Sequence, residues 1–329
     1  MMGTMAETVT DQTSSPTDLS IVVPLFDEEE NIGPFLDELF EVLSATDLVF
    51  EVICIDDGSS DRTFELLRER APQEPRLRVL RFGKNYGQTA AMSAGFHAAR
   101  GPVVVTLDGD QQNDPHDIPK LLEKYDEGYD VVSGWRRSRQ DGFLHRTLPS
   151  RMANWLISRI TGVHLHDYGC TLKAYRREVI DRFELYGQLH RFIPALAAWS
   201  GGRITEMEVN HRSRSRGRSK YGINRTVTVL LDLTIVKFLM SYGSHPIRVF
   251  GMAGFLAWGV ALASLVAVIV MKVWQQTDMT GNPLLYLAIL GVMVGLQILL
   301  MGVIAEMVMR TYHEAQDKRP YIIVEEINA

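Results

Sequence analysis

Three apolar runs of the sequence each end in acidic side chains that could bind a metal ion or a polar ligand. Glu28, Asp57 and the tripeptide Asp108-Gly109-Asp110 all come just after runs rich in Val, Ile and Leu. Carboxylates beside loop glycines bind a bare phosphate poorly. They do bind a divalent cation, which can in turn hold a diphosphate. The acid pair of Asp108 and Asp110 is the sharpest of these signals.

Segments of helical spacing separate the apolar runs. Strands are predicted over residues 19–26, 50–55, 77–82 and 102–107, and helices over 32–43, 63–70 and 89–99. Strands that alternate with helices predict an α/β fold with a doubly wound, mostly parallel sheet. Ligands of such sheets bind beyond the carboxyl ends of the strands. We therefore expect the acidic side chains to meet on one rim of the sheet.

Basic side chains gather in two clusters, although the net charge is −6 and argues against general nucleic-acid binding. Arg136, Arg137 and Arg139 form the first cluster, which continues to Arg146 and Arg151. The second, residues 211–225, holds six Arg or Lys residues and no acid. Arginine pairs well with phosphate in a bidentate manner. A solvated or nucleic-acid-binding loop is the alternative for the second cluster, and anionic lipid headgroups would also attract it.

Composition and the amino-terminal segment limit the compartment and the number of domains. The 329 residues have room for one α/β domain and an appendage. Residues 1–18 hold no Lys or Arg, so they predict a disordered tail rather than a secretory signal. Cys54 and Cys170 lie far apart without a metal-binding spacing, which favours a reducing compartment and no disulfide. We expect the domain over 19–225 to be cytoplasmic.

Two uncharged runs of 23 residues near the carboxyl end predict transmembrane helices over about 249–272 and 283–306. Such a run is roughly 34 Å of helix, enough to cross a hydrocarbon core of about 30 Å. Basic residues flank the pair, so both termini, including the tail 309–329, are predicted to be cytoplasmic. The segment 226–248 is also apolar, but Asp232 and Lys237 disfavour insertion. It predicts an interfacial helix on the membrane surface.

Four linked motifs resemble family 2 glycosyltransferases, in particular the polyprenyl-phosphate group of dolichyl-phosphate mannose synthases and bactoprenol glucosyltransferases. The motifs read IVVPLFDEEENI from Ile21, DDGSSD from Asp56, LDGDQQNDP from Leu107 and HRSRSRGRSKYG from His211. The likeness covers roughly residues 19–250, and the two-span anchor extends it. It implies a GT-A-like fold with a C-terminal transmembrane hairpin. Phe26, Asp27 and Gln111 depart from the family pattern; Gln111 either tunes the donor or metal or faces solvent.

The resemblance also implies roles for individual residues. The nucleotide of the donor would contact Pro24, Phe26, Glu28, Ile55, Asp57, Asp108 and Gly109. Asp110 and Gln112 would hold Mg²⁺ or Mn²⁺, for which oxygen ligands are suited. The phosphate groups and the acceptor would contact Arg136, Arg146, Arg214 and Lys220. Asp108, Asp110 and Asp167 would be the catalytic acids, with Asp167 acting either as a base or as an orienting group. Because a phosphate acceptor is already charged, the orienting role is favoured.

The resemblance implies the inverting transfer of a single sugar to an undecaprenyl-type phosphate at the cytoplasmic face of the inner membrane, for cell-envelope glycan modification. The donor would be a UDP- or GDP-linked sugar, and the sugar itself stays open. Membrane lipid would be a partner, nucleic acid would not, and a homo-oligomer is expected, with a tetramer as one candidate. Two alternatives stand beside this reading. One is a processive or hydroxyl-acceptor enzyme, although residues 188–192 only partly match a QxxRW motif. The other is a non-catalytic sugar-binding membrane subunit.

Overall fold

The computed structural model describes residues 17–137, 148–182, 185, 189–212, 233, 237, 246–274, 276, 281–314 and 321–328, with backbone only for 148–153, 246 and 309–314. The chain divides into two compact units. The first contains Met1–Leu233 and Pro320–Ala329, and the second contains Thr234–Arg319. Most of the predicted interfacial segment 226–248 lies outside the described residues. The same is true of the predicted tail 1–18 apart from its last two positions.

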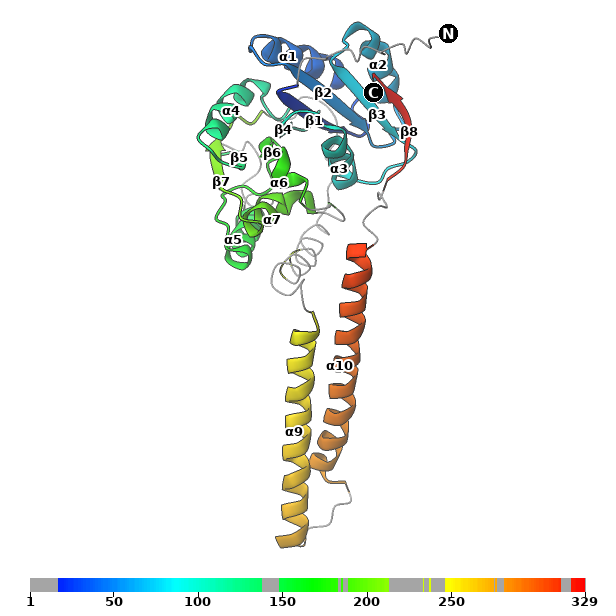
Figure 1. Ribbon diagram of the computed structural model, residues 1–329, viewed down its shortest axis with the longest axis vertical. Coiled ribbons are helices and arrows are strands. Elements are labelled where there is room, and N and C mark those ends of the chain that lie inside the picture. Colours follow the sequence, from blue (N-terminus) through cyan, green and yellow to red (C-terminus); the bar gives the residue numbers. More distant parts are fainter. Residues whose placement is uncertain are drawn as a thin grey trace, which may run out of the picture. The chain divides into compact units, whose positions relative to one another are not determined.

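The first unit is built on one eight-stranded mixed sheet with the strand order β7-β5-β6-β4-β1-β2-β3-β8 (Figure 1). The strands are β1 (Leu19–Leu25), β2 (Phe50–Asp56), β3 (Leu77–Phe82), β4 (Val103–Thr106), β5 (Val131–Trp135), β6 (Lys173–Arg176), β7 (Ile204–Glu208) and β8 (Ile323–Ile327). Strands β3, β2, β1 and β4 are parallel, as are β5 and β7. Strand β6 is antiparallel to both β4 and β5, and β8 is antiparallel to β3. The predicted doubly wound α/β sheet is confirmed.

Helices of the first unit connect and cover these strands. They are α1 (Ile32–Ser44), α2 (Thr63–Arg70), α3 (Gln88–Ala98), α4 (Ile118–Asp126), α5 (Leu148–Thr161), α6 (Arg177–Ile180) and α7 (Ile193–Trp199). Short 3-10 helices are η1 (Ala71–Gln73), η2 (Pro115–Asp117) and η4 (Leu189–Phe192). The helices predicted over 32–43, 63–70 and 89–99 match α1, α2 and α3 to within a residue or so.

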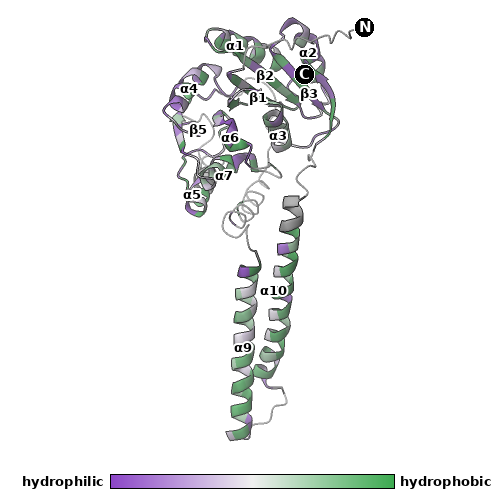
Figure 2. Cartoon of the chain, in the orientation of Figure 1, coloured by the Kyte–Doolittle hydropathy of each residue, from purple (hydrophilic) through white to green (hydrophobic). Residues whose placement is uncertain are grey.

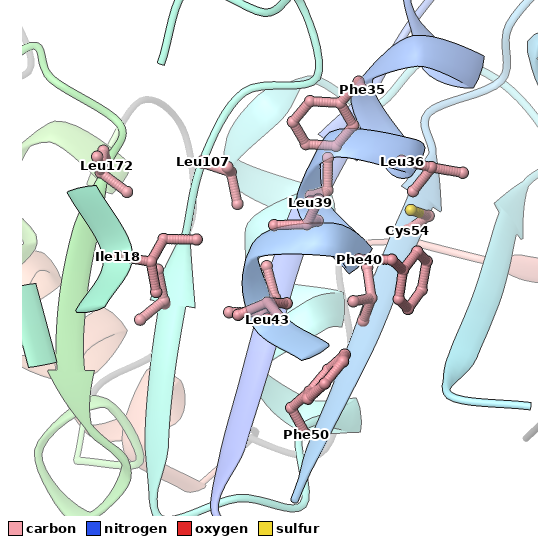
Figure 3. Packing of buried hydrophobic residues seen from close by; sticks show 14 of the residues in the cluster. Phe35, Leu36, Leu39, Phe40, Leu43, Phe50, Cys54, Leu107, Ile118 and Leu172 are labelled. Atoms are coloured by element: carbon pink, nitrogen blue, oxygen red, sulfur yellow. The ribbon is translucent and has the colours of Figure 1, made fainter. Parts of the chain in front are cut away.

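One face of the sheet carries the main hydrophobic core. Leu39 and Leu43 of α1 pack between Cys54 of β2 and Ile118 of α4 (Figure 3), and all four side chains are fully buried. Burying a leucine of this kind contributes about 1.5–3 kcal/mol. Strands β1 and β2 are buried on both faces, which explains their nearly continuous apolar sequences.

Helix α3 covers the opposite face of β1 and β2 at close range. A Cβ on Gly95 would overlap Val22, and it would lie 3.0 Å from the Ile55 side chain. The small residues of α3 therefore let its backbone approach the strands. The same helix is tied to η4 by a hydrogen bond of 2.6 Å between Thr89 Oγ1 and His190 Nδ1.

Part of the segment predicted as a carboxyl-terminal tail is a strand of the eight-stranded sheet. Residues 323–327 form β8, which pairs along β3. The side chain of Asn328 fixes the end of this strand, donating to the carbonyls of Ala71 and Leu77 at 2.8 Å each. Along the strand Ile-Val-Glu-Glu-Ile, partly buried and exposed residues alternate, as suits an edge strand.

The second unit is a helical hairpin of α9 (Pro246–Trp274) and α10 (Pro283–Glu314). The stretches Ile247–Trp274 and Pro283–Val308 are long and apolar enough to cross a membrane, and Figure 2 shows both helices hydrophobic around their circumference. Glycines line the contact: a Cβ on Gly254 would lie 2.8 Å from Leu299, and one on Gly291 would lie 2.9 Å from Ala261. Small residues of this kind bring helix backbones together in lipid.

Candidate active site

The direction of the strands gathers the chemically reactive segments on one rim of the sheet. Because β1, β2 and β4 are parallel, the residues that follow their carboxyl ends lie together there. Strand β5 runs in the same direction as β4, since both are antiparallel to β6. Strand β6 therefore brings its amino end, and with it residues 167–173, to the same rim. The acids predicted to meet on this rim are joined by groups from β5, β6 and β7.

Asp108 is held by two side chains from other elements. Gln88 Nε2 at the start of α3 donates to Oδ1 at 2.8 Å, and Thr171 Oγ1 donates to Oδ2 at 2.7 Å. Burial, together with the negative charge of Asp110, raises the pKa of Asp108 to about 6. Gly109 separates the two acids and packs so closely on Leu25 that a Cβ would overlap it.

Asp110 begins a tight turn next to Asp108. Its side chain is buried, and its Oδ1 accepts a hydrogen bond of 3.1 Å from the backbone N–H of Gln112. Gln111 has a left-handed backbone with φ 60, which is uncommon for a residue other than glycine. The repulsion between Asp108 and Asp110 is of the kind that a divalent cation relieves. The oxygen-rich sequence Asp110-Gln111-Gln112 therefore suits a hard cation.

Asp57 is buried at the end of β2 and accepts two backbone hydrogen bonds. The N–H groups of Tyr86 and Gly87 lie 2.7 and 2.9 Å from its two carboxylate oxygens. Burial raises the pKa of Asp57 to about 6, against the lowering effect of these hydrogen bonds. The loop 83–87 also packs on Gly58, whose φ is 69 and whose Cβ would overlap the backbone of Lys84. Asp57 and the loop 83–87 thus fix each other.

The loop after β1 is locked to the loop after β2. The N–H of Glu28 donates to Thr63 Oγ1 at 2.8 Å, and the carboxylate of Glu28 accepts from Asn31 Nδ2 at 2.7 Å. Pro24 and Phe26 are partly exposed on the rim. Ile55 is different: its side chain is fully buried against α3, so only its backbone lies near the rim.

Arg136 and Asp167 form a buried ion pair. The guanidinium donates from Nε to Oδ2 at 2.7 Å and from Nη2 to Oδ1 at 3.1 Å. Asp167 is 2% exposed and also accepts from the N–H of Gly169 at 3.1 Å. Burial lowers the pKa of Arg136, but the charges of Asp167, Cys170 and Asp108 and the hydrogen bonds to Asp167 together raise the pKa overall. The same guanidinium lies near enough to Asp108 to lower the pKa of that acid.

Three polar residues of the rim are absent from the sequence prediction. Gln88 and Thr171 hold Asp108, and Lys173 is a lysine only 2% exposed at the start of β6. Its ammonium donates to the carbonyls of Tyr168 and Cys170, and burial lowers its pKa. The only signal for Gln88 is that it follows the third predicted strand. Thr171 and Lys173 both lie close to Asp167 in sequence, but Thr171 precedes and Lys173 begins a strand, β6, that the sequence did not predict.

The basic segment after β7 begins beside the acid pair. The N–H of Arg212 donates to the Gln112 carbonyl at 3.0 Å, and His211 pairs with Asn113 in an isolated β-bridge. Arg214 and Lys220, which follow directly, lie outside the described residues, and so does Arg146. The attachment point of the segment is thus next to the predicted metal ligands.

A second group of possible metal ligands, Glu38, Asp114 and His116, lies on the surface nearby. The guanidinium of Arg212 is within 2.7 Å of both Glu38 and Asp114. An arginine therefore already neutralises these acids. The group serves as an anchor for Arg212 on α1 and η2.

An eight-stranded α/β sheet with an acid pair after β4 defines the GT-A class of glycosyltransferase folds. In agreement, the fold resembles a glucosyl-3-phosphoglycerate synthase of Mycobacterium tuberculosis, which was solved with Mn²⁺ and UDP-glucose. The TM-score is 0.52 at 18% identity, over 67% of this chain and 79% of that one. The family model described as Glycosyl transferase family 2 matches residues 20–183.

Two relatives match almost the whole chain. A dodecaprenyl-phosphate galacturonate synthase of Rhizobium johnstonii is 41% identical over 94% of this chain and 93% of its own length. An undecaprenyl-phosphate 4-deoxy-4-formamido-L-arabinose transferase of Aeromonas hydrophila is 36% identical over 93% and 92%. The chain belongs to glycosyltransferase family 2, and the resemblance noted from its motifs is confirmed.

Proposed function

We propose that this glycosyltransferase moves one sugar from a nucleoside diphosphate to a polyprenyl phosphate, with inversion at the anomeric carbon. The observation that carries the proposal is that two kinds of anion site lie side by side. Asp108 and Asp110 suit a cation that holds a diphosphate, and Arg136 beside them suits a second phosphate. Both of the relatives named above are polyprenyl-phosphate enzymes by name.

The donor would lie along the ends of β1, β2 and β4. Asp57, with Glu28 and Phe26, would face the base, because a carboxylate accepts hydrogen bonds from base N–H groups. Asp110 and Gln112 would hold Mg²⁺ or Mn²⁺, which would supply charge stabilisation for the leaving diphosphate. Asp108, fixed by Gln88 and Thr171, would position the ribose and diphosphate side.

The acceptor phosphate would approach Arg136. A phosphate oxygen is already anionic, so it needs positive charge for its approach more than it needs a base. Both oxygens of Asp167 are engaged by Arg136, which supports an orienting role for that acid. Arg146, Arg214 and Lys220 remain proposed phosphate contacts. The bonds that fix Arg212 support this for Arg214 and Lys220.

The hairpin and β8 support the proposed membrane arrangement. Two helices that cross the bilayer would return the chain to its starting side, and β8 pairs with β3 of the catalytic sheet. This supports a catalytic domain and a C-terminal strand on the same side of the membrane, and the basic residues that flank the hairpin support the cytoplasmic side. A homo-oligomer, with a tetramer as one candidate, remains a prediction.

The first experiment incubates the full chain in membranes with undecaprenyl phosphate, Mg²⁺ or Mn²⁺, and a panel of UDP- and GDP-linked sugars. The panel includes nucleotide-linked galacturonate and 4-deoxy-4-formamido-L-arabinose, the sugars in the relatives' names. Mass analysis of the lipid should find one sugar added. A lipid with many sugars would indicate a processive enzyme, and neither transfer nor hydrolysis of any donor would indicate a non-catalytic subunit.

Asp110→Asn tests the metal assignment with the best donor of that panel. We expect kcat to fall by about 10³-fold or more, since a key electrostatic group is lost, with the melting temperature almost unchanged. Asp126→Asn, an exposed position on α4, is the matched control and should keep wild-type activity. Near-normal turnover by Asp110→Asn would remove this residue from the metal site.

A further inference from the structure

The segment after the second membrane helix packs against the sheet through an aromatic side chain. Tyr321 is 5% exposed, and its ring stacks on Phe82 with centroids 5.1 Å apart and planes at 19°. Its hydroxyl lies 3.2 Å from Nδ1 of His97 on α3. Tyr321 therefore bridges β3 and α3 just ahead of β8.

A chain of contacts leads from Tyr321 to Asp57. Phe82 meets the ring of Tyr86 edge-on at 5.6 Å, and the N–H groups of Tyr86 and Gly87 hold the Asp57 carboxylate. At the other end of the same loop, Gly83 lies so near Val324 of β8 that a Cβ would be 3.1 Å away. The loop 83–87 is thus packed between the C-terminal segment and Asp57.

A second set of contacts, made by charged side chains, connects β8 to the end of β2. Glu325 of β8 is 4.0 Å from Arg81, and Arg81 is 3.8 Å from the buried carboxylate of Asp56. The guanidinium of Arg81 also lies over the ring of Phe64, 4.1 Å from its centroid. The residue before Asp57 is therefore tied to β8 as well.

We propose that the C-terminal segment 321–328 is a positioning element of the nucleotide pocket, with Tyr321 acting on Asp57 through Phe82 and the loop 83–87. The inference rests on the proposed function, because it takes Asp57 as the contact to the base. It assigns a role in donor binding to a segment that follows the membrane hairpin in sequence and contains none of the family motifs.

The test measures binding of UDP with Mn²⁺, and separately of inorganic pyrophosphate with Mn²⁺, to the full chain in detergent by calorimetry. Tyr321→Ala should weaken UDP binding about three- to tenfold, the scale of one lost aromatic stack. It should leave pyrophosphate binding, kcat and the KM for polyprenyl phosphate unchanged, because Asp57 faces the base and not the diphosphate. Tyr321→Phe keeps the stack and should bind UDP like the wild type.

Ile322→Ala is the matched control, since that neighbouring side chain is 64% exposed. If Tyr321→Ala does not fold, Tyr321→Leu keeps the apolar volume and takes its place. Equal weakening of UDP and pyrophosphate, or no weakening of either, overturns the inference. If the wild type itself bound neither UDP nor GDP, the proposed function would fail instead.

Discussion

At the scale of residues, the pair of Arg136 and Asp167 bears on the proposed activation of the acceptor. Both oxygens of Asp167 accept hydrogen bonds from one guanidinium, and the acid is almost completely buried. A base must be able to reach the proton that it removes. Because both oxygens of Asp167 accept hydrogen bonds from Arg136, this acid is better suited to orient the arginine toward a phosphate than to act as a base.

Asp167→Asn separates these roles. We expect a fall in kcat of about 10²-fold from misplacement of Arg136, a higher KM for the lipid, and a loss of stability of up to about 3 kcal/mol. The pH profile should keep its wild-type shape. Arg136→Lys is the paired variant, and the double variant should be little worse than either single one because the two residues act together. Loss of a limb of the pH profile in Asp167→Asn would point to a base.

The raised pKa of Asp57 predicts that kcat/KM for the donor depends on pH. Its pKa is raised to about 6, so kcat/KM for the donor should fall below that pH as the carboxylate loses its charge. The pKa of Asp108 is also raised to about 6. The acid limb of log kcat/KM should therefore approach a slope of two in the wild type and of one in Asp57→Asn. An unchanged limb in that variant would show that Asp57 does not control donor binding.

The raised pKa of Asp57 also determines how the stability of the fold changes with pH. The pKa of Asp57 in the folded chain lies above its ordinary value of 3.8. Its contribution to stability is therefore complete below pH 3.8 and is lost as the pH rises through 6. Between pH 5 and 7.5, the melting temperature of Asp57→Asn without donor should rise relative to that of the wild type.

The acids of the site could be predicted from sequence because each follows its strand within four residues. Glu28, Asp57, Asp108 and Asp110 lie on the expected rim for that reason. Gln88, Thr171 and Lys173 could not be predicted in this way. Their roles depend on contacts to distant parts of the chain, such as the bond between Thr171 and Asp108. The sequence also does not predict whether the side chain of a rim residue points outward. Ile55, for example, is fully buried.

At the scale of elements, the strands with the most apolar sequences were the predictable ones. Strands β1 to β4 are almost wholly buried, so their apolar runs were conspicuous. Strand β6 has only four residues, two of them basic, and was not predicted. Lys173 lies within it, paired opposite both Thr106 and Ser133. A short strand between two neighbours needs little hydrophobic pattern of its own, because the neighbours supply its hydrogen bonds.

The edge strand β8 was missed for the opposite reason. Its sequence Ile-Val-Glu-Glu-Ile contains neither a long apolar run nor a strict alternation of apolar and polar residues, so the sequence predicts only a tail over 309–329. What places it is the pairing with β3 and the anchors at Tyr321 and Asn328. None of these partners is near in sequence.

At the scale of the whole molecule, the return of the chain to the sheet predicts a hairpin topology. Cys54 and Cys170 are both fully buried, so an introduced cysteine would be the accessible thiol. In intact cells, Thr277→Cys between the helices should react with a membrane-impermeant maleimide. Ile322→Cys, at an exposed position before β8, should react only after the membrane is permeabilised. The reverse pattern would exclude a cytoplasmic catalytic domain.

The order of synthesis gives β8 another consequence. A ribosome completes β3 before either helix of the hairpin has been made, whereas β8 emerges after both. Until then β3 is a bare sheet edge, whose N–H and C=O groups can pair with any strand that meets them. Only a chain translated through the whole hairpin carries the missing strand. A chain that stops within the hairpin is thus left with an unpaired edge at β3, which favours aggregation or proteolysis.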